Sequence, residues 1–240
     1  MSLTELSLFA GAFLFTSTFS AAAGAGGGIL MIAILSGFIP AAMLIPVQNA
    51  ILLVNSSVRA GIYRQHINWV IAWPFIIGLG IGSFIGAFIY VQLPEKLISL
   101  FMGIAMLAFT WMPGKNSLLT NSVPLRVAMG AFHGFLSSLI GIGGLLQASF
   151  TKMGLAKNAR IATFATVISF NNVWRGLAFM FLGVSLANYW QLIAMAIPLA
   201  FMGGWLGKRI SDKIPESVFD YIFKTIVTLF ALRLLYKAVF

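Results

Sequence analysis

Two clusters of glycine interrupt the hydrophobic sequence, and their residues are the first that could do chemistry. One is Ala23-Gly24-Ala25-Gly26-Gly27-Gly28, and the other is Gly141-Ile142-Gly143-Gly144, 117 residues later in a chain of 240. Glycine frees backbone N–H groups, and such groups at the start of a helix attract anions. Close helix packing is the alternative, but several adjacent glycines exceed what packing requires. We therefore predict that both clusters contribute to an anion-binding site.

An arginine near the middle of a hydrophobic stretch is the second candidate. The stretch 161–182 has its midpoint at Asn171 and Asn172. Arg175 follows three residues later, about 4.5 Å along a helix axis. An arginine at this depth costs about 2.5 kcal/mol or more to insert, and its planar fork suits oxyanions. Snorkelling, or pairing with backbone carbonyls, is the structural alternative to an anion-binding role.

The corresponding point of the first half is also polar. It reads Asn55, Ser56, Ser57, Val58 and Arg59. We predict that these polar side chains offer hydrogen bonds to the same substrate, with Arg59 as a second positive charge. Anchoring of Arg59 at the cytoplasmic surface is the alternative role for that residue.

Polar residues also flank the second glycine cluster. His133 could relay a proton, donate to an anion or make an ordinary structural hydrogen bond. Two histidines and no cysteine argue against a zinc site, and we expect no metal, no cofactor and no catalytic residue. The predicted substrate-binding residues are Gly26, Gly27, Gly28, Asn55, Ser56, Ser57, Arg59, His133, Gly143, Gly144, Gln147, Asn171, Asn172 and Arg175.

Composition predicts that lipid surrounds the elements that position these residues. The chain is 60% hydrophobic and 8% charged, with a mean hydropathy of +0.99, whereas soluble domains carry roughly 25% charged residues. Its five acidic residues all lie away from the centres of the hydrophobic stretches, which argues against a cation pump. The net charge of +10 attracts either anionic lipid heads or an anionic solute.

Eight hydrophobic stretches have lengths close to the roughly 20 residues that cross a bilayer as a helix. Landmarks recur in the same order in both halves, which predicts an internal duplication. Besides the glycine clusters, Gly82-Ser-Phe-Ile-Gly86 matches Gly203-Gly-Trp-Leu-Gly207, for which we expect helix packing. The stretches are 6–35, 46–63, 69–91, 97–112, 127–150, 161–182, 189–206 and 218–236.

Loop charges predict the topology of an all-α polytopic membrane protein. If all eight stretches crossed, the basic loops of the two halves would lie on opposite faces, against the positive-inside rule. The conflict disappears if each glycine-bearing stretch is a re-entrant hairpin. Each half, 1–115 and 116–240, is then a hairpin plus three transmembrane helices, and the halves are inverted repeats. The N-terminus has no positive n-region, so we interpret it as mature protein rather than a signal peptide.

The glycine clusters, the two paired glycine motifs and the turns Leu93-Pro94 and Ile214-Pro215 together resemble the TauE/SafE family of sulfite exporters. The resemblance spans nearly the whole chain in two copies. The second copy departs from the family pattern, with Leu145 at the last position of its glycine cluster. The resemblance implies export of sulfite or small organosulfonates.

The predicted function is a secondary transporter of small oxyanions that works by alternating access, with an anion channel as the alternative. An intramembrane enzyme would need a constellation of titratable groups, and a scaffold would not need Arg175. We expect the bilayer and a small anion as partners, no nucleic acid, and a bacterial cytoplasmic (inner) membrane location. Such a protein could also form a homodimer.

Overall fold

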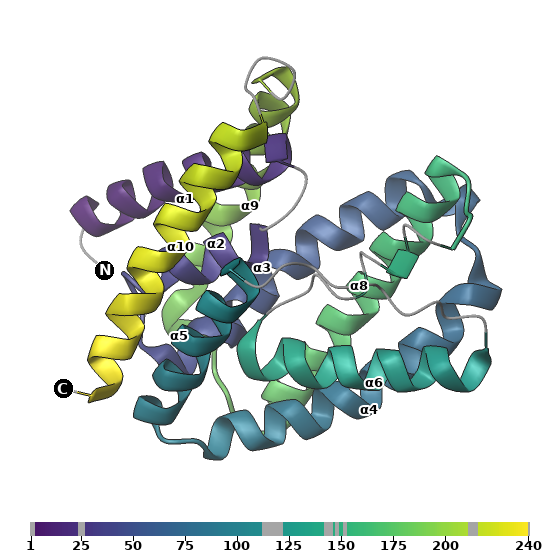
Figure 1. Ribbon diagram of the computed structural model, residues 1–240, viewed down its shortest axis with the longest axis horizontal. Coiled ribbons are helices and arrows are strands. Elements are labelled where there is room, and N and C mark those ends of the chain that lie inside the picture. The colour runs from purple at the N-terminus through teal and green to yellow at the C-terminus, as the bar shows by residue number, and fades with distance from the viewer. Residues whose placement is uncertain are drawn as a thin grey trace. The chain divides into compact units, whose positions relative to one another are not determined.

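The structure is a computed structural model, and every regular element in the residues that it describes is a helix (Figure 1). Those residues are 3–23, 27–111, 122–141, 146, 149–150, 153–210 and 216–239. The all-α prediction is confirmed. The helices are α1 (Leu3–Ala23), α2 (Gly27–Leu35), α3 (Ala41–Ile62), η1 (Arg64–His66), α4 (Trp69–Gln92), α5 (Glu95–Trp111), α6 (Val123–Ile140), α8 (Lys157–Phe181), η2 (Ala187–Tyr189), α9 (Trp190–Ile210) and α10 (Glu216–Val239).

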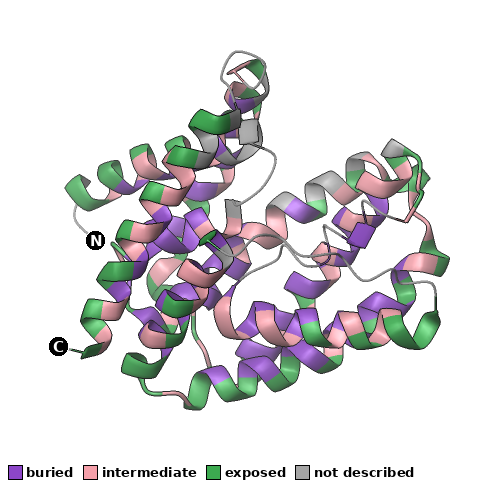
Figure 2. Ribbon diagram, viewed as in Figure 1, coloured by how far each residue is buried: buried purple, intermediate pink, exposed green. Residues whose placement is uncertain are grey.

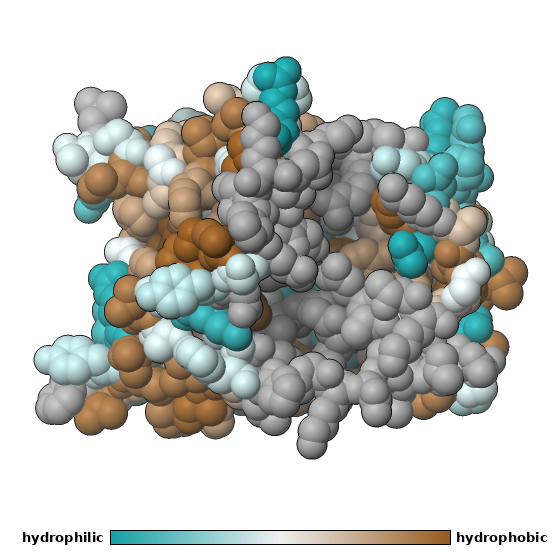
Figure 3. Space-filling model, turned by 45° about the horizontal axis from the view of Figure 1, so that its top comes forward, coloured by the Kyte–Doolittle hydropathy of each residue, from teal (hydrophilic) through white to brown (hydrophobic). Residues whose placement is uncertain are grey.

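In the part of the chain that the structure describes, three helical segments are long and apolar enough to cross a membrane: Trp69–Gln92, Val123–Ile140 and Ala187–Gly207. Large hydrophobic side chains are exposed along them, and buried and exposed residues alternate along α4 (Figure 2). Its exposed Val70, Trp73, Ile77, Ile81 and Phe84 follow a helical stripe. Hydrophobic residues also cover much of the described surface in Figure 3. A continuous apolar stripe of this kind is suited to lipid rather than water.

The chain divides into two compact units. Unit 1 comprises residues 1–48, 93–113 and 186–240, and unit 2 comprises residues 49–92 and 114–185. The division falls within α3, so the helix contributes its first part to unit 1 and the remainder to unit 2. Neither unit coincides with one of the predicted repeats, 1–115 and 116–240, which therefore stay a prediction.

In unit 1 the chain reverses direction between α1 and α2. Helix α1 ends at Ala23 and α2 begins at Gly27, so the stretch 6–35, predicted to be a hairpin, contains two helices. The ring of Phe38, just beyond α2, lies 5.6 Å from that of Phe9 near the start of α1. The two helices are therefore antiparallel and unequal, with 21 and 9 residues.

Unit 1 is completed by helices from both ends of the sequence. Helix α1 packs on α9, where Ser17 donates a hydrogen bond to the carbonyl of Ala200 at 3.1 Å, and a Cβ on Gly203 would lie 2.5 Å from Ser17. Helices α5 and α10 also pack together. The side chain of Glu95 accepts a hydrogen bond from the first N–H of α3, at Ala41 (2.9 Å), and so caps that helix.

In unit 2 the glycines of α4 and α6 bring two backbones into contact. A Cβ on Gly82 would overlap the backbone of Ala131, and one on Gly86 would lie 2.6 Å from the carbonyl oxygen of Phe135. From α6, a Cβ on Gly134 would lie 2.5 Å from the carbonyl oxygen of Leu79. Contacts ascend together along both helices, so α4 and α6 run parallel. The packing role predicted for Gly82 and Gly86 is confirmed, as it is for Gly203 in unit 1.

The chain of unit 2 also turns back after α6. Ser138, near the end of α6, lies beside Gly86, whereas the ring of Phe150 lies 5.3 Å from that of Phe75. Phe75 and Gly86 are separated by about 16 Å along α4. The chain therefore returns by roughly half the thickness of the hydrocarbon core, which is about 30 Å.

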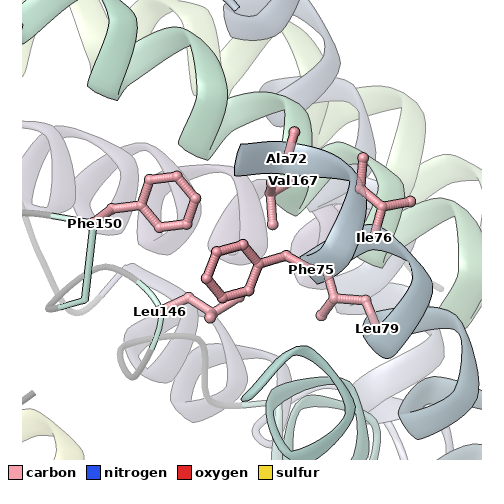
Figure 4. Packing of buried hydrophobic residues seen from close by; sticks show 7 residues of the cluster. All are labelled: Ala72, Phe75, Ile76, Leu79, Leu146, Phe150 and Val167. Atoms are coloured by element: carbon pink, nitrogen blue, oxygen red, sulfur yellow. The ribbon is translucent and has the colours of Figure 1, made fainter. Parts of the chain in front are cut away.

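An apolar cluster holds this returning segment. Phe150 and Leu146 pack against residues near the start of α4 and against α8 (Figure 4). Phe164 of α8 meets Phe150 edge-on, with ring centroids 5.5 Å apart. Burial of an aromatic or aliphatic side chain of this size stabilises the fold by about 1.5–3 kcal/mol. The cluster consists of Ala72, Phe75, Ile76, Leu79, Leu146, Phe150 and Val167.

Candidate functional site

Arg175 is the centre of a buried polar network in unit 2. The side chain is 2% exposed and donates three hydrogen bonds. Its Nε donates to Oδ1 of Asn49 (2.6 Å), Nη1 to the backbone carbonyl of Ser137 (2.6 Å) and Nη2 to Oδ1 of Asn172 (3.2 Å). These acceptors come from α3, α6 and α8, so the guanidinium links three helices. All three acceptors are neutral.

The network extends through both asparagines of α8. Asn172 donates to the hydroxyl of Ser56 (3.1 Å), and the amide of Asn49 donates to the backbone carbonyl of Asn172 (3.0 Å). Asn171 donates to the hydroxyl of Ser137 (3.2 Å) and accepts from that of Ser83 (3.2 Å). Helices α3, α4, α6 and α8 therefore each contribute a polar side chain to one buried cluster.

The network lies well inside the lengths of α4 and α8, and at the last turn of α6. Ser83 is 14 residues from the first residue of α4 and nine from the last. These separations correspond to about 21 and 14 Å along the axis. Asn171 holds a similar position in α8. Helix α8 runs parallel to α4, because Trp73 meets Phe170 and Tyr90 meets Phe179. The polar cluster thus lies near the middle of α4 and α8, away from both ends of these two helices.

No carboxylate is available within unit 2 to balance Arg175. Residues 49–92 and 114–185 contain no aspartate or glutamate, whereas all five acidic residues fall in unit 1. Eight of the fifteen basic residues belong to unit 2, so it carries most of the net charge of the chain. They are Arg59, Arg64, Lys115, Arg126, Lys152, Lys157, Arg160 and Arg175.

Three further buried polar groups of unit 2 have no hydrogen-bond partner among the described residues. They are both ring nitrogens of His133, the hydroxyl of Ser138 and the indole N–H of Trp174. His133 is 1% exposed and precedes Ser137 by one helical turn on the same face of α6. Buried polar groups normally have partners, so each of these groups could bind a polar ligand or water.

The structure brings four of the predicted site residues together: Ser56, Asn171, Asn172 and Arg175. Ser57 is exposed, whereas the members of the network are buried. Gly28 belongs to α2 in unit 1, where its carbonyl accepts a hydrogen bond from the amide of Gln48 (2.9 Å). Gly26, Gly143, Gly144 and Gln147 lie outside the described residues, as do the side chains of Asn55 and Arg59, while Gly27 is the first residue of α2.

Sequence reasoning missed three members of the network, namely Asn49, Ser83 and Ser137. Asn49 precedes Ser56 by seven residues, two turns of one helix, and this spacing within an apolar stretch was the available signal. Ser83 lies inside the Gly82–Gly86 packing motif and Ser137 is part of a Ser-Ser pair before Gly141. Within the described ranges, no three His, Asp or Glu side chains gather as a metal site would require.

The apolar helices with a polar centre place the chain in the class of helical membrane proteins. Comparison with known families is specific: the model of the sulfite exporters TauE/SafE matches residues 8–234. The chain therefore belongs to the TauE/SafE family, a family of membrane transporters, and the predicted resemblance is confirmed.

A curated relative agrees with this assignment. The chain is 23% identical over 212 residues to the Probable membrane transporter protein YunE of Bacillus subtilis (strain 168), with 77% of each chain covered. No solved structure matches the chain. The protein is thus an integral membrane transporter by family, and a transport role rather than catalysis is what this family suggests.

Proposed function

We propose that this protein is a secondary transporter that exports small oxyanions, first among them sulfite and organosulfonates, across the bacterial inner membrane by alternating access. The observation that carries the proposal is the burial of Arg175 among neutral partners in a unit without acidic residues. A buried charge without a counter-charge is costly, so an anion that binds there is strongly favoured.

The structural alternative for Arg175 explains part of its environment. The carbonyl of Ser137, which accepts from Nη1, is in the last turn of α6 and also accepts from the N–H of Gly141 (3.0 Å). A helix C-terminus carries roughly half a negative charge. That partial charge offsets about half of the guanidinium, which leaves a positive remainder for a ligand.

The guanidinium also has donors to spare. Arginine carries five N–H groups, and three of those of Arg175 are used by residues that the structure describes. The remaining two are on Nη1 and Nη2, which suffices for two charge-assisted hydrogen bonds to an oxyanion. The unpartnered groups of His133, Ser138 and Trp174 would add neutral contacts.

The packing within each unit supports the proposed inverted repeats. Helix α1 packs on α9 in unit 1, and α6 packs on α4 in unit 2, which is the same pairing with the two halves of the sequence exchanged. The chain reverses between α1 and α2, and again between the end of α6 and Phe150. Such reversals within apolar sequence are what re-entrant hairpins would produce, although α1 and α6 are longer than half-helices.

Transport in proteoliposomes tests the function. Purified protein should move sulfite and methanesulfonate but not sodium or potassium. The Arg175→Gln variant should lose at least about tenfold in rate, because charge-assisted hydrogen bonds contribute about 1.5–3 kcal/mol. Arg64→Gln is the matched control, since Arg64 is exposed in η1. Equal rates for wild type and Arg175→Gln would overturn the site assignment.

Counterflow separates a carrier from the channel alternative. Unlabelled anion on the far side should accelerate uptake of labelled anion by a carrier, whereas unitary currents in a planar bilayer would indicate a channel.

Membrane topology is testable because the chain has no cysteine. Cysteines placed at Lys115 and Lys157 should be labelled from the cytoplasmic side and one at Lys96 from outside. Labelling of the first two from opposite sides would contradict the inverted repeats.

A further inference from the structure

We infer that the Arg175 site selects monovalent oxyanions over divalent ones, an inference that rests on the proposed function and narrows its substrate class. The charge of the buried groups is the basis. Within the described part of unit 2, Arg175 is the one fully buried cation, and part of its charge is offset by the C-terminus of α6. Other members of the network are amides, hydroxyls and two backbone carbonyls.

A monovalent anion therefore brings the cluster close to neutrality. A divalent anion would leave about one and a half negative charges in a buried, apolar surrounding, whereas a monovalent anion leaves about half of one. Burial of the larger uncompensated charge is far more costly. Leu79 is the last residue of α4 in the apolar cluster, and it lies one helical turn before Ser83. The apolar cluster is therefore close to the polar network. The environment thus penalises the second charge of a substrate.

His133 is the residue that could in principle supply a second positive charge. It lies about 6 Å along α6 from Ser137, whose carbonyl binds Arg175. Met129, one turn before it, packs against the apolar cluster. His133 is thus between that cluster and the polar network, with both ring nitrogens unpartnered among the residues described.

The surroundings of this imidazole offer no counter-charge for a second positive charge. The titratable or charged groups on α6 and the helices packed against it are Tyr90 of α4, Arg126 of α6 itself, and Lys157, Arg160 and Arg175 of α8. None of them is a carboxylate that could stabilise an imidazolium. A neutral imidazole offers one N–H donor and one acceptor nitrogen. That combination suits a substrate with a protonated oxygen, such as bisulfite, better than a second anionic oxygen.

Competition between two sulfur oxyanions tests the inference in proteoliposomes of the full-length protein. Methanesulfonate and sulfate share a tetrahedral sulfur and differ by one charge. We expect sulfate to compete with labelled methanesulfonate at least about tenfold more weakly than unlabelled methanesulfonate does. Equal competition that still depends on Arg175 would overturn the inference and leave the proposed function standing. Absence of transport of any oxyanion would overturn both.

A pH series with sulfite removes the difference in shape. Sulfite passes from monoanion to dianion near neutral pH, so its flux should fall with rising pH in proportion to the monoanion. Methanesulfonate keeps one charge throughout and reports any titration of the protein itself. A sulfite flux that rises or stays level, beside a level methanesulfonate flux, would contradict the inference.

A variant of His133 provides a gain of function. His133→Arg adds a permanent positive charge next to the network, and should raise the ratio of sulfate to methanesulfonate competition by about tenfold. His66→Arg is the matched control, since His66 is exposed in η1 and is the other histidine of the chain. An unchanged ratio in folded His133→Arg protein would contradict the inference, and the wild-type selectivity and sulfite pH series decide it if this variant does not fold.

Discussion

Nε of Arg175 donates a 2.6 Å hydrogen bond to Oδ1 of Asn49, across 126 residues of sequence. The acceptor is an amide, where a stable ion pair would have a carboxylate. Aspartate has nearly the same shape as asparagine, but an aspartate at position 49 would neutralise the charge of Arg175. The choice of amide over acid leaves the charge of Arg175 available to a ligand.

The variant Asn49→Asp should convert the site into an internal ion pair. The new carboxylate would occupy the charge of Arg175, so anion transport should fall by at least about tenfold while the protein remains folded. Loss of the amide that donates to Asn172 costs about 1–3 kcal/mol, which the ion pair offsets. Uptake of methanesulfonate and thermal unfolding in detergent measure the two effects.

Asn68→Asp is the control for Asn49→Asp. Asn68 accepts a hydrogen bond from the N–H of Ile71 at the start of α4 (3.2 Å), and aspartate serves equally well in such a cap. The same charge is thereby added to unit 2 away from the network. Equal loss of transport in both variants would show that the network is not the anion site.

Gly82→Ala should destabilise the protein by about 1–3 kcal/mol or more, because its Cβ would overlap the backbone of Ala131 and force α4 and α6 apart. Gly204→Ala is the matched control: it belongs to the corresponding motif in α9 and has open space at its Cβ. The control should be neutral or up to about 1 kcal/mol more stable. Thermal unfolding of both variants distinguishes packing from a local preference for glycine.

Gly141→Ala tests the turn that ends α6. Gly141 has a φ of 70°, in the left-handed region where a Cβ costs about 1–2 kcal/mol. Gly141→Asn should cost less, because asparagine tolerates this conformation. Gly61→Ala, in the last turns of α3 and with open space at its Cβ, should have little effect. We expect the unfolding temperature to be lowest for Gly141→Ala, intermediate for Gly141→Asn and highest for the wild type. The reverse order would contradict a left-handed turn at Gly141.

The sequence was most informative where single residues violate the rules of an apolar helix. Arg175 and the Asn171-Asn172 pair stand out because polar groups at that depth are costly, and the structure places all three in one network. The packing role of Gly82 and Gly86 was also predictable, because glycines in a helix that crosses lipid usually serve close helix packing.

Other members of the site could not be predicted, because the local periodicity of the sequence does not show which distant helices pack together. Asn49 and Ser137 are ordinary polar residues until the fold brings them to Arg175. Ser57 adjoins Ser56 in sequence, yet successive residues of a helix point about 100° apart, so one is buried and the other exposed. Each unit is built from segments of both halves of the sequence. Hydropathy alone does not show which of these segments pack together.

Thermal stabilisation of the purified protein by methanesulfonate tests the central claim most directly. A ligand at a hundred times its dissociation constant stabilises the folded state by about 2.7 kcal/mol. We expect such a shift in the wild type and in Arg64→Gln, and none in Arg175→Gln. An equal shift in Arg175→Gln, or none in the wild type at any concentration, would contradict the claim that the buried guanidinium of Arg175 binds the transported anion.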